Sequence, residues 1–162
     1  MSMNQARWLL GTFVVLAILS FVWGHNPAQL RTDPVSGPVH SIDIDKSCLI
    51  KGVGCSVLVG DLGAAVIQVP SVIKPLEKFT FVVNPNALLL KNLGSVSVDF
   101  QMVGMDMGIN QYPLSRQADG TFQQVIILPV CTTTRTDWVA LVSLTTISGV
   151  YVVKLPFVVD RR

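Results

Sequence analysis

Apolar and polar positions alternate along most of the chain from residue 55 onward. The pattern is clearest at 95–102, where Val98, Phe100 and Met102 share one face of an extended strand and polar residues occupy the other. Short apolar runs of this kind are separated by Gly, Pro, Asn and Asp, which favour turns. The pattern predicts strands at 55–59, 64–69, 78–84, 95–105, 121–128, 137–146 and 150–159.

Seven short strands in about 105 residues predict an all-β fold, an immunoglobulin-like antiparallel β-sandwich. The last two strands should form a hairpin around 147–149. We also expect a helical turn at 84–94, with Asn84 as its cap and Pro85 at its first helical position. Trp138 is interpreted as a core residue of the sandwich.

An apolar run of 16 residues without a charge, at 8–23, precedes this domain. Trp8 and Trp23 at its ends are typical of a membrane-spanning helix, and Arg7 places the amino terminus in the cytoplasm. We therefore expect a single N-terminal transmembrane helix, with the C-terminal domain outside the cytoplasm. A cleaved signal peptide is the alternative, and both interpretations export the remainder.

The chain accordingly divides into an anchor or signal peptide at 1–24, an extended linker at 25–54 and the sandwich domain at 55–162. Three prolines interrupt the linker and favour extended backbone. A short edge strand at 41–45 is the one regular element expected within it.

Composition narrows the function classes. Hydrophobic residues make up 50% and charged residues 14%, the opposite of a disordered chain. The net charge of +2 comes without a basic cluster, so no nucleic acid is expected as a partner. The histidines, His25 and His40, both fall in the linker, which argues against a catalytic triad, a zinc site or a blue-copper site in the domain. We expect neither an enzyme nor a small-molecule substrate.

Three cysteines are present in a domain that we expect to be exported. Cys48 and Cys55 are close in sequence, and an oxidising compartment favours a disulfide between them. Cys131 would then be a buried thiol, a redox thiol or a soft metal ligand. Two alternatives remain open: a bridge from Cys131 to one of the other two, and a set of three reduced or metal-linked thiols.

Three of the five methionines cluster just after the alternating strand. Met102 has the parity of the core, whereas Met105 and Met107 have the opposite parity and should project together from the strand end. Thioethers and thiolates are soft ligands that favour Cu(I), so Met105, Met107 and, as a third ligand, Cys131 are candidate metal ligands. The alternative is that the methionines fill the rim of the core.

The pairing of the strands at 95–105 and 121–128 determines whether Cys131 can lie near Met105 and Met107. If the strands at 95–105 and 121–128 formed a simple antiparallel pair, Cys131 would lie far from Met105 and Met107. Only strands in opposite sheets, or a loop that folds back, would bring the three sulfur atoms together.

Several short motifs resemble the FixH/YtkA-like family over roughly residues 55–160. They are Gly-Met-Asp-Met-Gly at 104–108, Asn-Gln-Tyr-Pro-Leu at 110–114, Asp-Gly-Thr-Phe at 119–122, Ile-Leu-Pro-Val-Cys at 127–131, Asp-Trp-Val-Ala at 137–140 and the apolar run at 153–159. The resemblance implies a membrane-anchored immunoglobulin-like domain in copper import or assembly of haem–copper oxidases. Its implied partners are a respiratory oxidase or a copper transporter in the inner membrane, and its implied ion is Cu(I).

The sequence therefore supports two candidate functions. The first is a membrane-anchored periplasmic accessory protein in copper handling or oxidase assembly. The second is a non-catalytic interaction or structural module that binds no metal.

Overall fold

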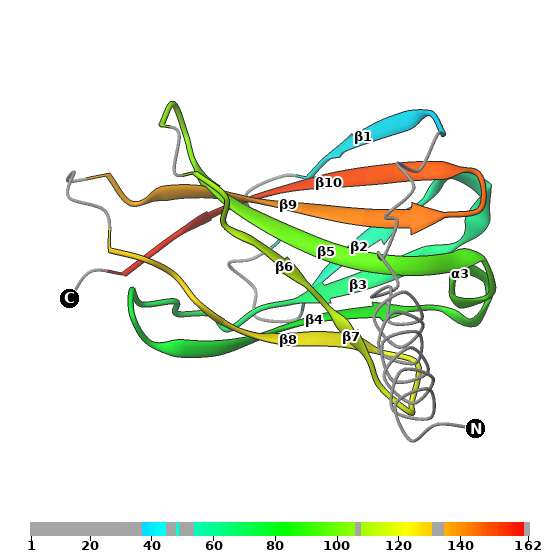
Figure 1. Ribbon diagram of the computed structural model, residues 1–162, viewed down its shortest axis with the longest axis horizontal. Helices are drawn as coiled ribbons and strands as arrows, with labels where there is room; N and C mark the ends of the chain where they lie inside the picture. Colours follow the sequence, from blue (N-terminus) through cyan, green and yellow to red (C-terminus); the bar gives the residue numbers. More distant parts are fainter. Residues whose placement is uncertain (1–36, 45–47, 49–53, 106–107, 131–134, 161–162) are drawn as a thin grey trace, which may run out of the picture. The chain divides into compact units, whose positions relative to one another are not determined.

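The computed structural model describes residues 37–44, 48, 54–105, 108–130 and 135–160 (Figure 1). All of them belong to the second of two compact units, which begins at Val35. Within the described residues, no helix has both the length and the apolar character needed to cross a membrane. The segment expected to be an anchor, 1–24, lies outside the described residues, as does His25.

Two five-stranded sheets face each other around one hydrophobic core. The strands are β1 (Val39–Asp43), β2 (Cys55–Leu58), β3 (Ala64–Gln68), β4 (Lys78–Pro85), β5 (Leu93–Met102), β6 (Gln111–Pro113), β7 (Ser115–Arg116), β8 (Phe122–Ile127), β9 (Asp137–Thr146) and β10 (Gly149–Val158). Sheet A has the spatial order β1-β10-β9-β5-β6, and sheet B has the order β2-β3-β4-β8-β7. The predicted all-β sandwich is confirmed at this level.

Each of the seven predicted strands is present, with ends shifted by no more than three residues. The alternation explains the success, because one face of each strand is buried between the sheets. In β9, for example, Trp138 and every second residue after it are buried. Met102 lies opposite Trp138 in the β5–β9 register, and both side chains are almost fully buried, as expected.

The cap of the helical turn lies two residues later than expected. Asn84 still pairs with Val66 in the sheet, and Pro85 ends β4 as a buried residue opposite Ala65. The helix α3 (Ala87–Asn92) begins after Asn86, whose side chain accepts a hydrogen bond of 2.9 Å from the backbone N–H of Leu89. The prediction of Asn84 as the cap is therefore wrong, because sheet pairing holds that residue in extended conformation.

Strand β1 draws part of the expected linker into the sandwich. It pairs parallel with β10, from Val39 opposite Val150 to Asp43 opposite Lys154. Ile42 packs against the core from this edge. The edge strand expected at 41–45 is thus present, but it begins two residues earlier and belongs to sheet A.

The chain changes sheets between β6 and β7, which the sequence pattern did not predict. Leu114 is the single residue between the two strands, and its side chain is buried. Its N–H donates to the carbonyl oxygen of Val96 at 2.9 Å, so the chain continues past β5 before it joins β8. Strands of two or three residues are too short to show a recognisable alternation of apolar and polar residues in the sequence.

Candidate functional site

Met105 lies in a tight turn that closes β5. The strand was expected to continue to Met105, but it ends at Met102, because Gly104 takes a positive φ of 75° and the chain reverses there. The N–H of Met105 donates to the carbonyl oxygen of Met102 at 3.2 Å. Met105 is therefore paired back onto the strand, and its half-buried side chain packs against the core.

Strands β5 and β8 lie in opposite sheets and run in the same direction. β6 is antiparallel to β5, β7 continues from β6, and β8 is antiparallel to β7. Both strands therefore deliver the chain to the same end of the sandwich, on the left in Figure 1. The described residues that meet there are 69–77, 103–105, 108–110, 128–130, 135–136 and 158–160, and we call this region the methionine end.

Backbone contacts tie these segments together. The N–H of Val103 donates to the carbonyl oxygen of Asp137 at 3.3 Å, and the N–H of Leu76 donates to that of Leu128 at 3.0 Å. The N–H of Asp160 donates to the carbonyl oxygen of Ile73 at 2.8 Å. The segment that carries Met105 is thus adjacent to the start of β9, at Asp137.

This arrangement bears directly on the candidate ligands. β5 and β8 do not form a simple hairpin. They lie in opposite sheets, which is the arrangement that would allow the two sulfur-bearing segments to meet. Met105 is described within it. Met107 and Cys131 lie outside the described residues, so their shared direction and their distance from Met105 stay predictions.

An ion pair at the start of β9 lies beside the turn that carries Met105. Arg135 Nε donates to Asp137 Oδ1 at 2.9 Å, and a Cβ added at Gly104 would lie 3.9 Å from Arg135 Nη1. The hydrogen bond to Asp137, reinforced by its charge, raises the pKa of Arg135 above its ordinary value. Both side chains are about half exposed, so the pair orients this loop more than it stabilises the fold.

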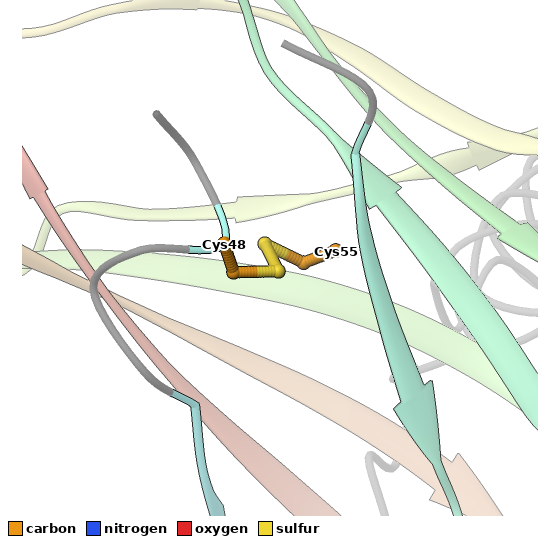
Figure 2. Close-up of a disulfide and its surroundings, with 2 residues drawn as sticks. All are labelled: Cys48 and Cys55. Carbon is orange, nitrogen blue, oxygen red and sulfur yellow. A yellow bond between two sulfur atoms is a disulfide. The ribbon is translucent and has the colours of Figure 1, made fainter. Parts of the chain in front are cut away.

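The predicted disulfide between Cys48 and Cys55 is present (Figure 2). Their Cα atoms are 5.4 Å apart, within the usual range for a bridge. Cys55 begins β2 and is fully buried, and Cys48 follows β1, so the bridge joins an edge of sheet B to the chain leaving an edge of sheet A. These two sulfur atoms are consequently not available as metal ligands.

His40 lies far along the sandwich from the methionine end. It belongs to β1 and stacks on Tyr151, with ring centroids 4.7 Å apart and an interplanar angle of 19°. Among the described residues, no three His, Cys, Asp or Glu side chains are grouped so that they could hold a metal ion.

Exposed aliphatic side chains are the feature of this end that the sequence interpretation missed. Several large apolar residues of the converging segments are exposed: Val72, Leu76, Val103, Ile109, Val130 and Val158. Ile109 is 98% exposed, which is exceptional for an isoleucine. The available signal was weak, because an isolated apolar residue in a loop does not reveal which other loops lie beside it.

Comparisons with known proteins add little to this geometry. No protein-family profile matches the chain, and no curated protein matches it. The human F-spondin reeler domain is similar in structure over 67% of this chain and 100% of that domain, with 10% sequence identity and a TM-score of 0.39. Similarity at this level carries no argument about function.

Proposed function

We propose that this chain is a membrane-anchored, exported accessory protein that binds Cu(I) transiently at the methionine end of its sandwich. In this proposal the protein serves copper handling or the assembly of a respiratory haem–copper oxidase, as in the FixH/YtkA-like family that its motifs resemble. The anchor is the apolar segment at 8–23, and the ligands are Met105, Met107 and Cys131.

The immunoglobulin-like form of the sandwich is part of the proposal, and the strand order supports it. β3-β4-β8-β7 corresponds to the A-B-E-D sheet of that fold, and β10-β9-β5 corresponds to its G-F-C sheet. β6 then takes the place of the additional strand C′. On this assignment, β1 and β2 are additions at the two edges.

The single observation that carries the copper proposal is the parallel course of β5 and β8 in opposite sheets. It brings the turn of Met105 and the described residues that follow β8, 128–130, to one end of the sandwich, where the N–H of Val103 donates to the carbonyl oxygen of Asp137. Two thioethers and a thiolate from two neighbouring loops form a soft ligand set, which prefers Cu(I) to Zn²⁺. Few ligands and half-exposed loops suit transfer of an ion better than storage.

Anaerobic titration of the full chain with Cu(I), against a chromogenic competitor, tests the proposal. Replacing Met105 and Met107 together by leucine should abolish binding while it changes the free energy of unfolding by less than about 1.5 kcal/mol, because Leu and Met have similar volumes. Met102→Leu is the matched control: that thioether is buried in the core, and its loss should leave binding intact.

Two results would contradict this proposal. A double variant that stays folded and binds Cu(I) as tightly as the parent would remove the methionines from the site. A double variant that unfolds, while Met102→Leu does not, would show that Met105 and Met107 serve as the rim of the core.

A second candidate function is a non-catalytic interaction module without a metal. The exposed aliphatic side chains of the methionine end favour it, because clustered apolar exposure marks interaction surfaces in soluble domains. Absence of Cu(I) binding in the parent chain would leave this candidate in place.

A further inference from the structure

The aliphatic side chains at the methionine end form a recognisable set. Val72 and Leu76 come from the segment before β4, Val103 and Ile109 flank the methionine turn, and Val130 follows β8. Each is between 45% and 98% exposed. The segments that carry these side chains are far apart in the sequence but lie at one end of the sandwich, on the left in Figure 1.

The described charged residues of this end are three basic and three acidic, with a net charge of zero: Lys74, Lys78, Arg135, Glu77, Asp137 and Asp160. Lys74 pairs with Glu77 at 4.0 Å, and Arg135 pairs with Asp137, each within its own segment. Lys78 begins β4 at the same end and is exposed, so its long side chain can extend toward a polar boundary. An uncharged, apolar partner fits this surface better than an acidic or a basic one.

We propose that the methionine end docks on a lipid bilayer and inserts its aliphatic side chains at the boundary of headgroups and acyl chains. The proposal rests on the membrane anchor of the proposed function. Lipid contact is non-directional and suits single Val, Leu and Ile side chains on separate loops. The exposed large apolar residues described at this end are all aliphatic and come from separate loops, so burying them in lipid needs no pocket of matching shape.

The length of the chain outside the described residues permits this contact. β1 begins beside Val150, at the opposite end of the sandwich from Met105, so the preceding chain joins the domain there. The 13 residues at 24–36 can extend to about 45 Å. A strand as long as β10, with its 10 residues, measures about 34 Å. The segment is thus long enough for the methionine end to reach the bilayer that holds residues 8–23.

A pair of labelled variants of the full chain tests the docking. With Cys131 replaced by serine and the Cys48–Cys55 bridge intact, one cysteine is introduced as Ile109→Cys and, in a separate protein, as Ile147→Cys. Ile147 is 82% exposed in the β9–β10 hairpin at the opposite end and is therefore the matched control. Each cysteine carries an environment-sensitive fluorophore, and each protein is reconstituted in phosphatidylcholine–phosphatidylglycerol vesicles with or without brominated acyl chains.

Brominated lipid should quench the label at Ile109 by about twofold or more and leave the label at Ile147 nearly unchanged, because only inserted groups meet the acyl chains. If the chain floats with the vesicles while the label at Ile109 is unquenched, the docking is overturned and the anchor stands. Equal quenching of both labels also overturns it. A chain that does not float with vesicles overturns the anchor and the docking together.

One further outcome separates lipid from protein. Suppose that, in detergent, the fluorophore at position 109 reports a less polar environment as the protein concentration rises. If brominated lipid also fails to quench it in vesicles, a second copy of the chain covers this end. That result would overturn docking on the bilayer.

Discussion

The two ends of the sandwich are held together differently. At the end that contains the β9–β10 hairpin, which we call the hairpin end (37–38, 86–93, 117–121 and 146–149), backbone groups and glycines approach one another closely. At the methionine end, loops with exposed aliphatic side chains cover an aromatic core. There Thr146 Oγ1 donates to the carbonyl oxygen of Gly149 at 2.9 Å, and the N–H of Ile147 donates to that of Asn92 at 3.2 Å. These bonds connect the hairpin to α3.

The methionine end relies on packing beneath its loops instead. Phe100 is buried and makes edge-to-face contacts with four aromatic rings at centroid distances of 5.9–6.1 Å: Phe79, Phe81, Tyr112 and Phe157. Tyr112 also donates from its hydroxyl to the carbonyl oxygen of Ile127 at 3.0 Å, which links the two sheets. A rigid aromatic layer can therefore support loops whose own side chains contribute little to folding.

The largest effect that we predict tests this division at the methionine end. Phe100→Ala should lower the free energy of unfolding by about 3–5 kcal/mol, because it leaves a cavity among four rings. Ile109→Ala, in the loop above, should change it by less than about 0.5 kcal/mol, because the side chain is almost fully exposed. Urea denaturation of both variants measures the difference. Similar losses in both would show that the loops, too, hold the fold together.

The second prediction tests the hairpin end. A Cβ at Gly149 would collide with the carbonyl oxygen of Pro38, and Gly149 has a φ of 139°, so Gly149→Ala should cost about 2–4 kcal/mol. At Gly108 a Cβ would meet nothing within 4 Å, and its φ of 67° alone should cost about 1–2 kcal/mol. Thermal unfolding of both proteins gives the comparison.

A third glycine serves as a control for the general effect of replacing glycine by alanine. Gly94 has an ordinary φ, and a Cβ there would lie 3.6 Å from the carbonyl oxygen of Thr145, a normal contact. Gly94→Ala should therefore be nearly neutral. If Gly108→Ala destabilised the protein as much as Gly149→Ala, the contrast between the two ends would be wrong.

The third prediction concerns the disulfide, which lies between the ends. Replacing Cys48 and Cys55 by alanine should lower stability by about 2–3 kcal/mol, the value expected for a loop this short. Copper binding should not change, because neither residue belongs to the methionine end. Thiol titration of the denatured, unreduced parent should find one free thiol, that of Cys131, and three thiols would contradict the bridge.

The sequence predicted the strands well because their burial alternates residue by residue, as Trp138 and Met102 show. It could not predict which sheet each strand joins. β6 and β7 are too short to be recognised, and the passage of the chain from one sheet to the other at Leu114 depends on tertiary contacts. The cap at Asn86 was missed for a similar reason: pairing of Asn84 with Val66 is not visible locally. For the candidate site, the sulfur residues could be named from their chemistry, but the sequence could not show that β5 and β8 run to the same end of the sandwich, because that depends on the sheet topology.

The smallest predicted effect belongs to the hairpin end, at the turn before β8. Thr121 donates two hydrogen bonds to Asp119 Oδ1, from its hydroxyl at 2.7 Å and from its backbone N–H at 2.9 Å. The hydroxyl bond, followed by the backbone bond, lowers the pKa of Asp119 below its ordinary value. Because the folded pKa is depressed, the contribution to stability is present above the ordinary carboxyl pKa and is lost as pH falls through the folded pKa.

Thr121→Val tests this assignment, because valine keeps the backbone N–H and the shape of the side chain but removes the hydroxyl. The pKa of Asp119, followed through its side-chain carbon resonance, should rise toward the ordinary aspartate value in the variant without reaching it, since the backbone bond remains. Stability at neutral pH should hardly change, because the carboxylate is fully exposed. An unchanged Asp119 titration would mean that the hydroxyl bond is not formed in solution, and that this turn of the hairpin end is less firmly held than the bonds around Thr146.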